Sequence, residues 1–292
     1  MMASRRRIGC LQFCVAVGLV AATAAAAADA SRTLDRIRAD SAIHLGYRAG
    51  AAPFSFRERD GRIRGYSAEL CNRIATAIQK QLGLPALKIE WTPLAAADRL
   101  DAVAKGKVDI ECGTTTASLS RYEQVDFSLP IFVDGGSILT RTDAKLARLA
   151  DFAGKRIAVI PRTTTESALK RELTVLGTKA DLIPVADGAA GLALLTDGKA
   201  DGYAGDRIVL VSARAGSADP AKFMLLDTDF SFEPYALVVR RDDPDFRLAV
   251  NRALVEIYRS GDIDEIYYRW LGAMGRPGPL LHSMFYLNTL PE

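Results

Sequence analysis

Residues 156–176 read RIAVIPRTTTESALKRELTVL, and this stretch decides the fold class. Residues 156–160 form a short apolar run that predicts a buried strand. The hydroxyl cluster Thr163-Thr164-Thr165-Glu166 follows it and opens a helix predicted over residues 164–176. A strand followed directly by a helix is the repeating unit of an α/β fold.

The same alternation extends from this stretch in both directions. The sequence predicts strands at residues 43–47, 88–91, 108–110, 201–204, 223–226 and 235–240. It predicts helices at residues 66–82, 98–104, 189–195, 244–260 and 262–271. The tail contains Gly275, Pro277, Gly278 and Pro279, which predict an extended rather than a helical segment. We therefore expect α/β sheets joined by helical crossovers.

Two stretches about ninety residues apart resemble each other. Residues 100–109 (LDAVAKGKVD) and 192–201 (LALLTDGKAD) both predict an apolar helix that glycine stops, then a lysine and a strand. They indicate two similar lobes. Because the chain returns late to a strand, we expect residues 133–232 to form an inserted second lobe. Residues 29–132 and 233–292 then form the first.

The N-terminus predicts a secretory signal peptide over residues 1–28. Arg5, Arg6 and Arg7 precede an apolar stretch at residues 8–20, and an alanine-rich run ends at Ala28. A membrane anchor is the alternative, and the arginines faintly match a twin-arginine signal. No other apolar run nears the ~18 residues needed to span a bilayer. We expect an exported protein.

The net charge of the chain indicates which kinds of partner it can bind. The chain has 38 basic and 35 acidic residues, and cleavage after residue 28 removes three arginines, leaving 35 of each. A neutral mature protein has no basic field for nucleic acid or anionic membranes, so we expect neither as a partner. Two cysteines remain, Cys71 and Cys112. They can form one disulfide in an oxidising compartment or stay two small buried thiols.

Catalytic motifs are absent from the sequence. It contains no G-x-S-x-G or H-E-x-x-H pattern, and its two histidines, His44 and His282, are not in a metal-spaced cluster. The Gly-Lys pairs that begin at residues 106, 154 and 198 lack the remaining residues of a phosphate loop. We therefore expect no enzyme, no metal and no cofactor.

Two hydroxyl clusters follow predicted strands. Residues 114–116 (TTT) come after the strand at 108–110, and residues 163–166 come after the strand at 156–160. Open α/β sheets bind ligands at the carboxyl ends of their strands, and a helix N-terminus favours an anion. The alternative is that Thr163 only caps its helix, with Glu166 completing a capping box.

Charged residues lie near the same strand ends. Arg48, Arg99, Arg121 and Arg162 offer guanidinium groups, which suit carboxylates, and Asp206 can accept hydrogen bonds from an ammonium. Together they form a minimal recognition set for an α-amino acid. Taken singly, each arginine is more typical of a solvated surface charge than of a ligand contact.

Several short stretches carry a family resemblance: residues 34–37 (LDRI), 53–56 (PFSF), 65–67 (GYS), 111–116 (ECGTTT), 127–128 (FS) with 131–133 (IFV), and 163–166 (TTTE). From residue 33 to about 290 the chain resembles the family 3 periplasmic solute-binding proteins for polar amino acids, especially the glutamate/aspartate branch. The resemblance implies a type II periplasmic-binding-protein fold, with two lobes of mainly parallel sheet and flanking helices and the ligand in the cleft. It also implies a monomer that serves an ABC permease.

The resemblance assigns the ligand α-carboxylate to Arg121, with help from Thr116 and from the helix N-terminus at Thr163 and Thr164. These four residues would hold the part that all amino acids share.

It assigns the α-ammonium to Asp206, with Thr114 beside it. Arg48 and Arg99 match the pair that holds the side-chain carboxylate in the acidic-ligand branch. The resemblance therefore implies a preference for glutamate or aspartate.

Three positions depart from that branch. Ala96 replaces a serine, Gly188 replaces a histidine, and Arg162 replaces the usual glycine before the threonines.

Two other functions remain as alternatives. One is an exported enzyme similar to cyclohexadienyl dehydratase, with Glu111 as the candidate acid or base. The other is an amino-acid sensor.

Overall fold

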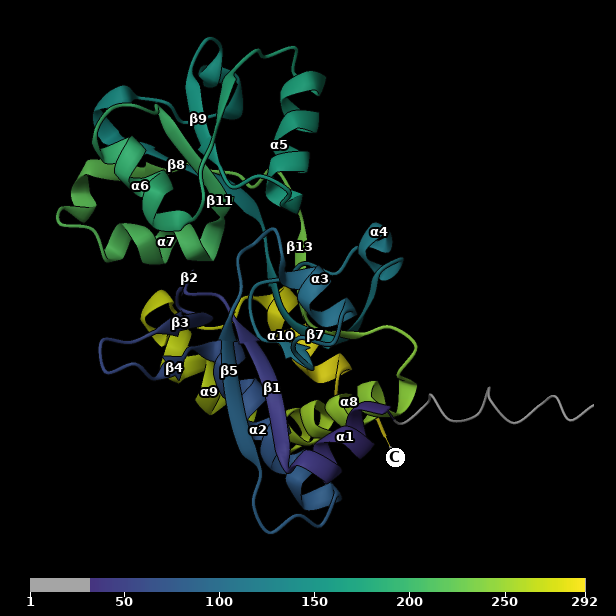
Figure 1. The fold of residues 1–292 in the computed structure, drawn as a ribbon. Helices are drawn as coiled ribbons and strands as arrows, with labels where there is room; N and C mark the ends of the chain where they lie inside the picture. The colour runs from purple at the N-terminus through teal and green to yellow at the C-terminus, as the bar shows by residue number, and fades with distance from the viewer. Residues whose placement is uncertain (1–31, 292) are drawn as a thin grey trace, which may run out of the picture.

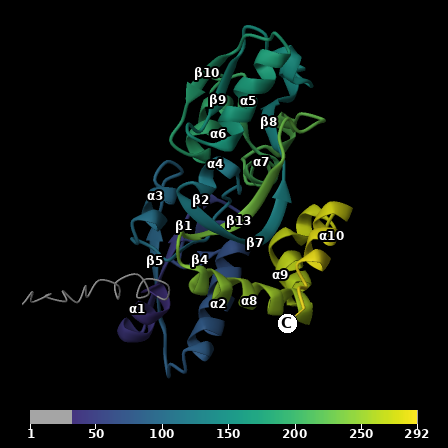
Figure 2. The same cartoon turned by 90° about the vertical axis from the view of Figure 1, so that its right-hand side faces the viewer.

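The computed structural model describes residues 32–291, so the predicted signal peptide lies outside the described residues. Figures 1 and 2 show two lobes, one above the other, each built on its own sheet. Both sheets have five strands. No helix within residues 32–291 is both long and apolar enough to cross a membrane.

Lobe 1 has the strand order β5-β1-β6-β13-β7. The bounds are β1 (Ala42–Tyr47), β5 (Lys88–Pro93), β6 (Ile110–Glu111), β7 (Val125–Asp134) and β13 (Glu233–Arg240). The first three are parallel, and β13 pairs antiparallel with β6 and β7. A small sheet of β2 (Gly50–Ala51), β3 (Ser55–Arg57) and β4 (Ile63–Arg64) precedes α2.

Helices cover both faces of the lobe 1 sheet. One core cluster joins the sheet to α1 (Arg32–Asp40), α2 (Tyr66–Gln81), α8 (Pro244–Ser260), α9 (Asp262–Leu271) and α10 (Pro279–Leu287). A second cluster includes buried residues of α3 (Arg99–Ala104), and α4 (Leu119–Tyr122) lies just before β7. Helix α2 buries Leu70, Ile74 and Ile78, and α8 buries Phe246, Val250 and Leu254.

Lobe 2 repeats this plan with the order β10-β9-β11-β8-β12. Its strands are β8 (Gly136–Arg141), β9 (Arg156–Val159), β10 (Asp181–Pro184), β11 (Gly202–Asp206) and β12 (Phe223–Leu225). Three are parallel, and β8 is antiparallel to both neighbours. Its helices are α5 (Thr164–Val175), α6 (Gly188–Thr196) and α7 (Arg207–Ala215), with short 3₁₀ turns at η1 (Thr142–Ala144), η2 (Leu149–Phe152) and η3 (Pro220–Lys222).

The two similar stretches of sequence form the same structural junction. Gly106 and Gly198 each end a helix with φ of 68°, a left-handed conformation that glycine adopts without strain. The next residue closes both junctions in the same way. Lys107 N donates to Ala102 O over 2.8 Å, and Lys199 N donates to Leu194 O over 2.9 Å. The next strands, β6 and β11, hold the middle position in their sheets.

The chain passes between the lobes twice, from β7 into β8 and from β12 into β13. Figure 2 shows these segments running side by side. A Cβ on Gly135 would lie 2.5 Å from the Asp229 side chain, and one on Gly136 would lie 2.5 Å from Ser231 Oγ. Gly136 N also donates to Ser231 Oγ over 2.9 Å. Glycine therefore lets the two crossings pack closely together.

The prediction of an extended tail is wrong, because residues 279–287 form α10. Pro279 takes the first helical position, where its missing N–H costs nothing. Leu281, Met284 and Phe285 are buried in the lobe 1 core. The glycines and prolines that follow η4 (Gly272–Met274) predict a break in the helical structure. In the sequence this signal outweighed the helical spacing of the three buried residues.

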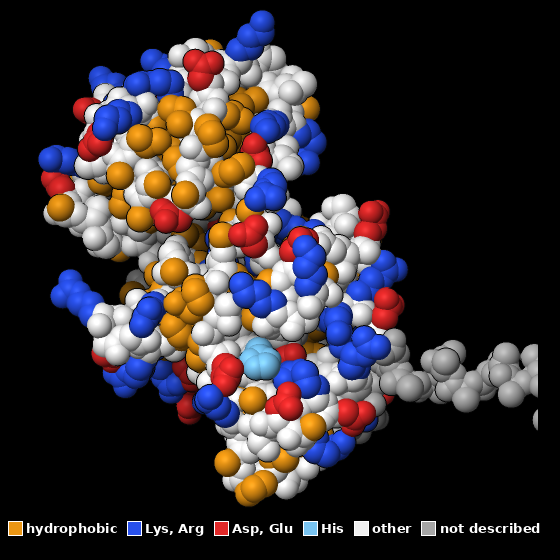
Figure 3. Space-filling view, in the orientation of Figure 1, with side chains coloured by type: hydrophobic (Ala, Val, Ile, Leu, Met, Phe, Trp, Pro, Cys, Tyr) orange, Lys and Arg blue, Asp and Glu red, His pale blue; other side chains and the backbone are white. Residues whose placement is uncertain are grey.

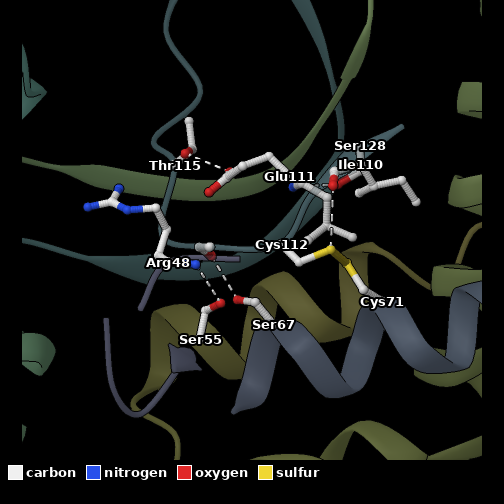
Figure 4. The surroundings of a disulfide bond; sticks show 11 residues. Arg48, Ser55, Ser67, Cys71, Ile110, Glu111, Cys112, Thr115 and Ser128 are labelled. Atoms are coloured by element: carbon white, nitrogen blue, oxygen red, sulfur yellow. Dashed lines mark hydrogen bonds between the residues drawn. A yellow bond between two sulfur atoms is a disulfide. The ribbon is translucent and has the colours of Figure 1, made fainter. Parts of the chain in front are cut away.

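A disulfide joins Cys71 of α2 to Cys112 just after β6 (Figure 4). Of the two alternatives for these cysteines, the bridge is therefore the one that the structure contains. Both residues are fully buried. The bond ties a helix of lobe 1 to the segment that leads into residues 114–116.

Candidate functional site

A cavity of about 380 Å³ lies between the two lobes. Lobe 1 contributes the segments after β1, β5 and β6, and lobe 2 contributes those after β9, β10 and β11. Figure 3 shows the furrow between the lobes. Six of the eight predicted ligand-binding residues line the cavity: Arg48, Arg99, Thr114, Thr163, Thr164 and Asp206. The strand ends thus converge as the α/β pattern predicts.

The N-terminus of α5 forms one wall. Thr163 is its N-cap, since its hydroxyl accepts from Glu166 N over 3.0 Å and donates to Ile160 O over 2.8 Å. Only one of the two hydrogen bonds of a capping box is present. The Glu166 carboxylate accepts from Arg162 N, whereas a capping box requires it to accept from Thr163 N. The amides of residues 164 and 165 have no partner within residues 32–291. They are the donors that an anion would use.

Arg99 is held rigidly in the lobe 1 wall. It is 4% exposed, its Nε donates to Thr115 Oγ1 over 2.7 Å, and Nη1 donates to Ala96 O. Burial, together with the positive charges of Arg48 and Arg121, lowers its pKa to about 9. A nearby anion would relieve this repulsion.

Arg48 lies half-buried on the same wall. Its backbone N–H donates to Ser55 Oγ over 3.0 Å. Its guanidinium has no hydrogen-bond or ion-pair partner among the described residues and extends away from the disulfide (Figure 4). The cavity therefore contains a cation that no carboxylate of residues 32–291 neutralises by direct contact.

Asp206 ends β11 on the lobe 2 wall, and its carboxylate accepts from Thr165 Oγ1 over 2.8 Å. Burial, with a further contribution from the negative charge of Glu233, raises its pKa. Burial also raises the pKa of Asp134, at the first crossing, to about 7, and the charge of Asp206 adds to this. A bound ammonium would offset this gathering of negative charge.

The sequence did not single out Glu233, which is 1% exposed at the start of β13. Its carboxylate accepts from Thr164 Oγ1 and Ser231 Oγ, each over 2.7 Å, and from Thr116 Oγ1. Thr116 belongs to lobe 1 and Thr164 to lobe 2, so this carboxylate bridges the lobes. The only signal in the sequence was an acidic residue opening a buried strand.

Two predicted residues, Thr116 and Arg121, lie beside the cavity and do not line it. The Thr116 hydroxyl is turned towards Glu233 and is 3.3 Å from the Thr164 hydroxyl. Arg121 Nη1 donates to Thr116 O over 2.6 Å. Glu111, the candidate catalytic group, is also outside the lining, and its Oε2 accepts from Thr115 Oγ1.

The three departures from the acidic-ligand branch fall in different places. Ala96 and Gly188 line the cavity, whereas Arg162 is exposed and does not. Arg162 has φ of 61°, which strains a residue with a Cβ. This backbone conformation explains why glycine suits that position.

Comparison with known families places this architecture. Residues 43–273 match the model of the bacterial extracellular solute-binding proteins, family 3. The chain belongs to this family. No group of three or more His, Cys, Asp or Glu within residues 32–291 is arranged to hold a metal ion.

Relatives of this solute-binding protein have informative names. It is 33% identical to the L-glutamate/L-aspartate-binding protein of Pseudomonas aeruginosa over 82% of this chain and 79% of the relative. It is 29% identical to the glutamate/aspartate import solute-binding protein of Escherichia coli over 89% and 86%. The crystal structure of the ancestral amino acid-binding protein AncCDT-1, a precursor of cyclohexadienyl dehydratase, is 29% identical with a TM-score of 0.71, covering 82% of this chain and 99% of that one.

Proposed function

We propose that this protein is the periplasmic substrate-binding component of an ABC importer and binds an acidic amino acid, glutamate or aspartate. The observation that carries the proposal is the arginine group at the cavity. The guanidinium of Arg48 has no partner within residues 32–291, and burial, followed by the like charges of Arg48 and Arg121, lowers the pKa of Arg99. A side-chain carboxylate between these two arginines would neutralise both.

The shared part of the amino acid fits the opposite side of the cavity. Asp206 accepts the α-ammonium beside Thr114, while the free amides at the start of α5 donate to the α-carboxylate. The family resemblance also assigns Arg121 and Thr116 to this anion, and both lie beside the cavity rather than in its lining. The names of the glutamate/aspartate-binding relatives support the same ligand class.

Hinge closure follows from the two crossings. The inserted lobe within residues 133–232 is proposed to move against lobe 1 about the two crossings, at residues 134–136 and 226–233. The closed form would dock as a monomer on permease subunits in the inner membrane. A buried disulfide and the predicted signal peptide support a periplasmic location.

We propose binding rather than catalysis for this cleft. Elimination would need an acid or base facing the substrate. Glu111, the candidate for that role, lies outside the cavity lining and is bonded to Thr115. The acidic residues that do line the cavity are Asp187 and Asp206. Asp187 caps the N-terminus of α6, and Asp206 is assigned to the ligand ammonium.

Thermal unfolding tests the function. Glutamate or aspartate at about a hundredfold excess over Kd should stabilise the protein by about 2.7 kcal/mol, because the ligand binds only the folded state. Lysine and leucine should produce no shift. Asp206→Asn should abolish the shift for every amino acid, since it removes the partner of the ammonium. A shift with lysine but none with acidic amino acids would refute the proposal.

A further inference from the structure

One polar side chain in the cavity lining within residues 32–291 has no role in the site described above. Tyr203 of β11 is 2% exposed, yet it lines the cavity. Its hydroxyl forms no hydrogen bond within residues 32–291 and is not one of the fully enclosed unpaired atoms, so it is reached from the cavity. A polar group in this position is available to a ligand.

Three glycines surround this tyrosine. A Cβ on Gly191 would lie 2.5 Å from the ring of Tyr203, so this glycine gives the ring its room. Cβ atoms on Gly188 and Gly205 would lie 3.1 and 3.7 Å from the Tyr203 hydroxyl. Gly188 also faces lobe 1, where its Cβ would be 3.7 Å from Gly50 O. The hydroxyl therefore borders open space where the two lobes meet.

The charges around the hydroxyl indicate which part of a ligand reaches it. Burial, and then the negative charges of Asp206 and Asp187, raise the pKa of Tyr203, while the positive charge of Arg48 opposes this shift. The phenol thus stays protonated and is a hydrogen-bond donor. It lies within electrostatic reach of both Asp206, which is assigned to the ammonium, and Arg48, which is assigned to the side-chain carboxylate.

We propose that the Tyr203 hydroxyl donates a hydrogen bond to the side-chain carboxylate of the bound acidic amino acid, in a subsite that Gly188 keeps open. This inference rests on the proposed function and adds a specificity residue to it. It also gives a physical reason for glycine at residue 188. A side chain there would occupy the space that the carboxylate needs to reach the phenol.

Titrations of Tyr203→Phe with glutamate and glutamine test the proposal. A hydrogen bond to a charged group is worth more than one to a neutral group. We expect glutamate to lose about tenfold or more in affinity and glutamine to lose less than tenfold. The melting temperature without ligand should stay unchanged, because the hydroxyl has no partner to lose. Tyr267→Phe, a buried tyrosine of α9 away from the cavity, is the matched control.

Gly188→Ala gives an independent reading. Residue 188 opens α6, where alanine favours the helix over glycine, so the protein should fold at least as well. Glutamate affinity should nevertheless fall, since the new methyl group takes the space next to the phenol.

Wild-type affinity for glutamate in Tyr203→Phe, or equal losses for glutamate and glutamine, would overturn the inference while leaving the proposed function intact. A wild-type protein that binds no acidic amino acid would instead refute the proposed function, and the inference would fall with it.

Discussion

Arg48→Gln is expected to lower the affinity for glutamate by about 2–5 kcal/mol while leaving the affinity for glutamine nearly unchanged. The guanidinium lines the cavity without a partner among the described residues, so its main interaction is with the ligand. Removing it leaves the side-chain carboxylate of glutamate desolvated and less well paired. Glutamine carries no charge there and loses little. Parallel calorimetric titrations of both ligands measure the difference.

Arg59→Gln is the matched control, because Arg59 lies exposed between β3 and β4 and does not line the cavity. It removes the same charge from the same lobe and should change neither affinity. Equal losses for glutamate and glutamine in Arg48→Gln would mean that Arg48 has a structural role. The preference for acidic ligands would then lose its main support.

Removing the disulfide is expected to lower the free energy of unfolding by about 4 kcal/mol. The bond closes a loop with a sequence separation of 41 residues, and breaking it returns that loop's conformational freedom to the unfolded chain. Cys71→Ala/Cys112→Ala, made in the chain from residue 29, shows this loss in urea unfolding. A reducing agent should destabilise the wild-type protein and leave the double variant unaffected.

The bond also supports the site, because only Gly113 separates Cys112 from residues 114–116. Ser67 Oγ donates to Gly113 O over 2.8 Å and provides a second attachment of this segment to α2 (Figure 4). We therefore expect the double variant to retain measurable binding at low temperature. Equal stability of the wild-type protein with and without reducing agent would contradict the assigned role of the disulfide.

Local signals in the sequence were sufficient for the two-lobed α/β fold. The junctions at Gly106 and Gly198 depend on residues close in the chain, and their similarity predicted two similar sheets. The helix at residues 279–287 was missed because its stability comes from burying Leu281 and Phe285 against distant helices. Tertiary packing of this kind leaves only a weak periodic trace in nine residues.

The site was predictable where it follows from strand ends. Arg48 directly follows β1 and Asp206 ends β11, so the sheet topology brings them to the cleft. Glu233 and Tyr203 could not be found in this way. Glu233 accepts hydrogen bonds from hydroxyls of both lobes. The position of Tyr203 depends on three glycines that leave space around its side chain. Contacts that arise only when the lobes meet have no counterpart in local sequence.

A calorimetric titration of the chain from residue 29 tests most directly whether the cleft is built for an acidic amino acid. L-Glutamate, L-aspartate, L-glutamine and L-lysine would be titrated separately under the same conditions. We predict saturable binding of one acidic amino acid per chain, weaker binding of glutamine, and none of lysine. Saturable binding of lysine, with no heat from glutamate or aspartate, would contradict the account.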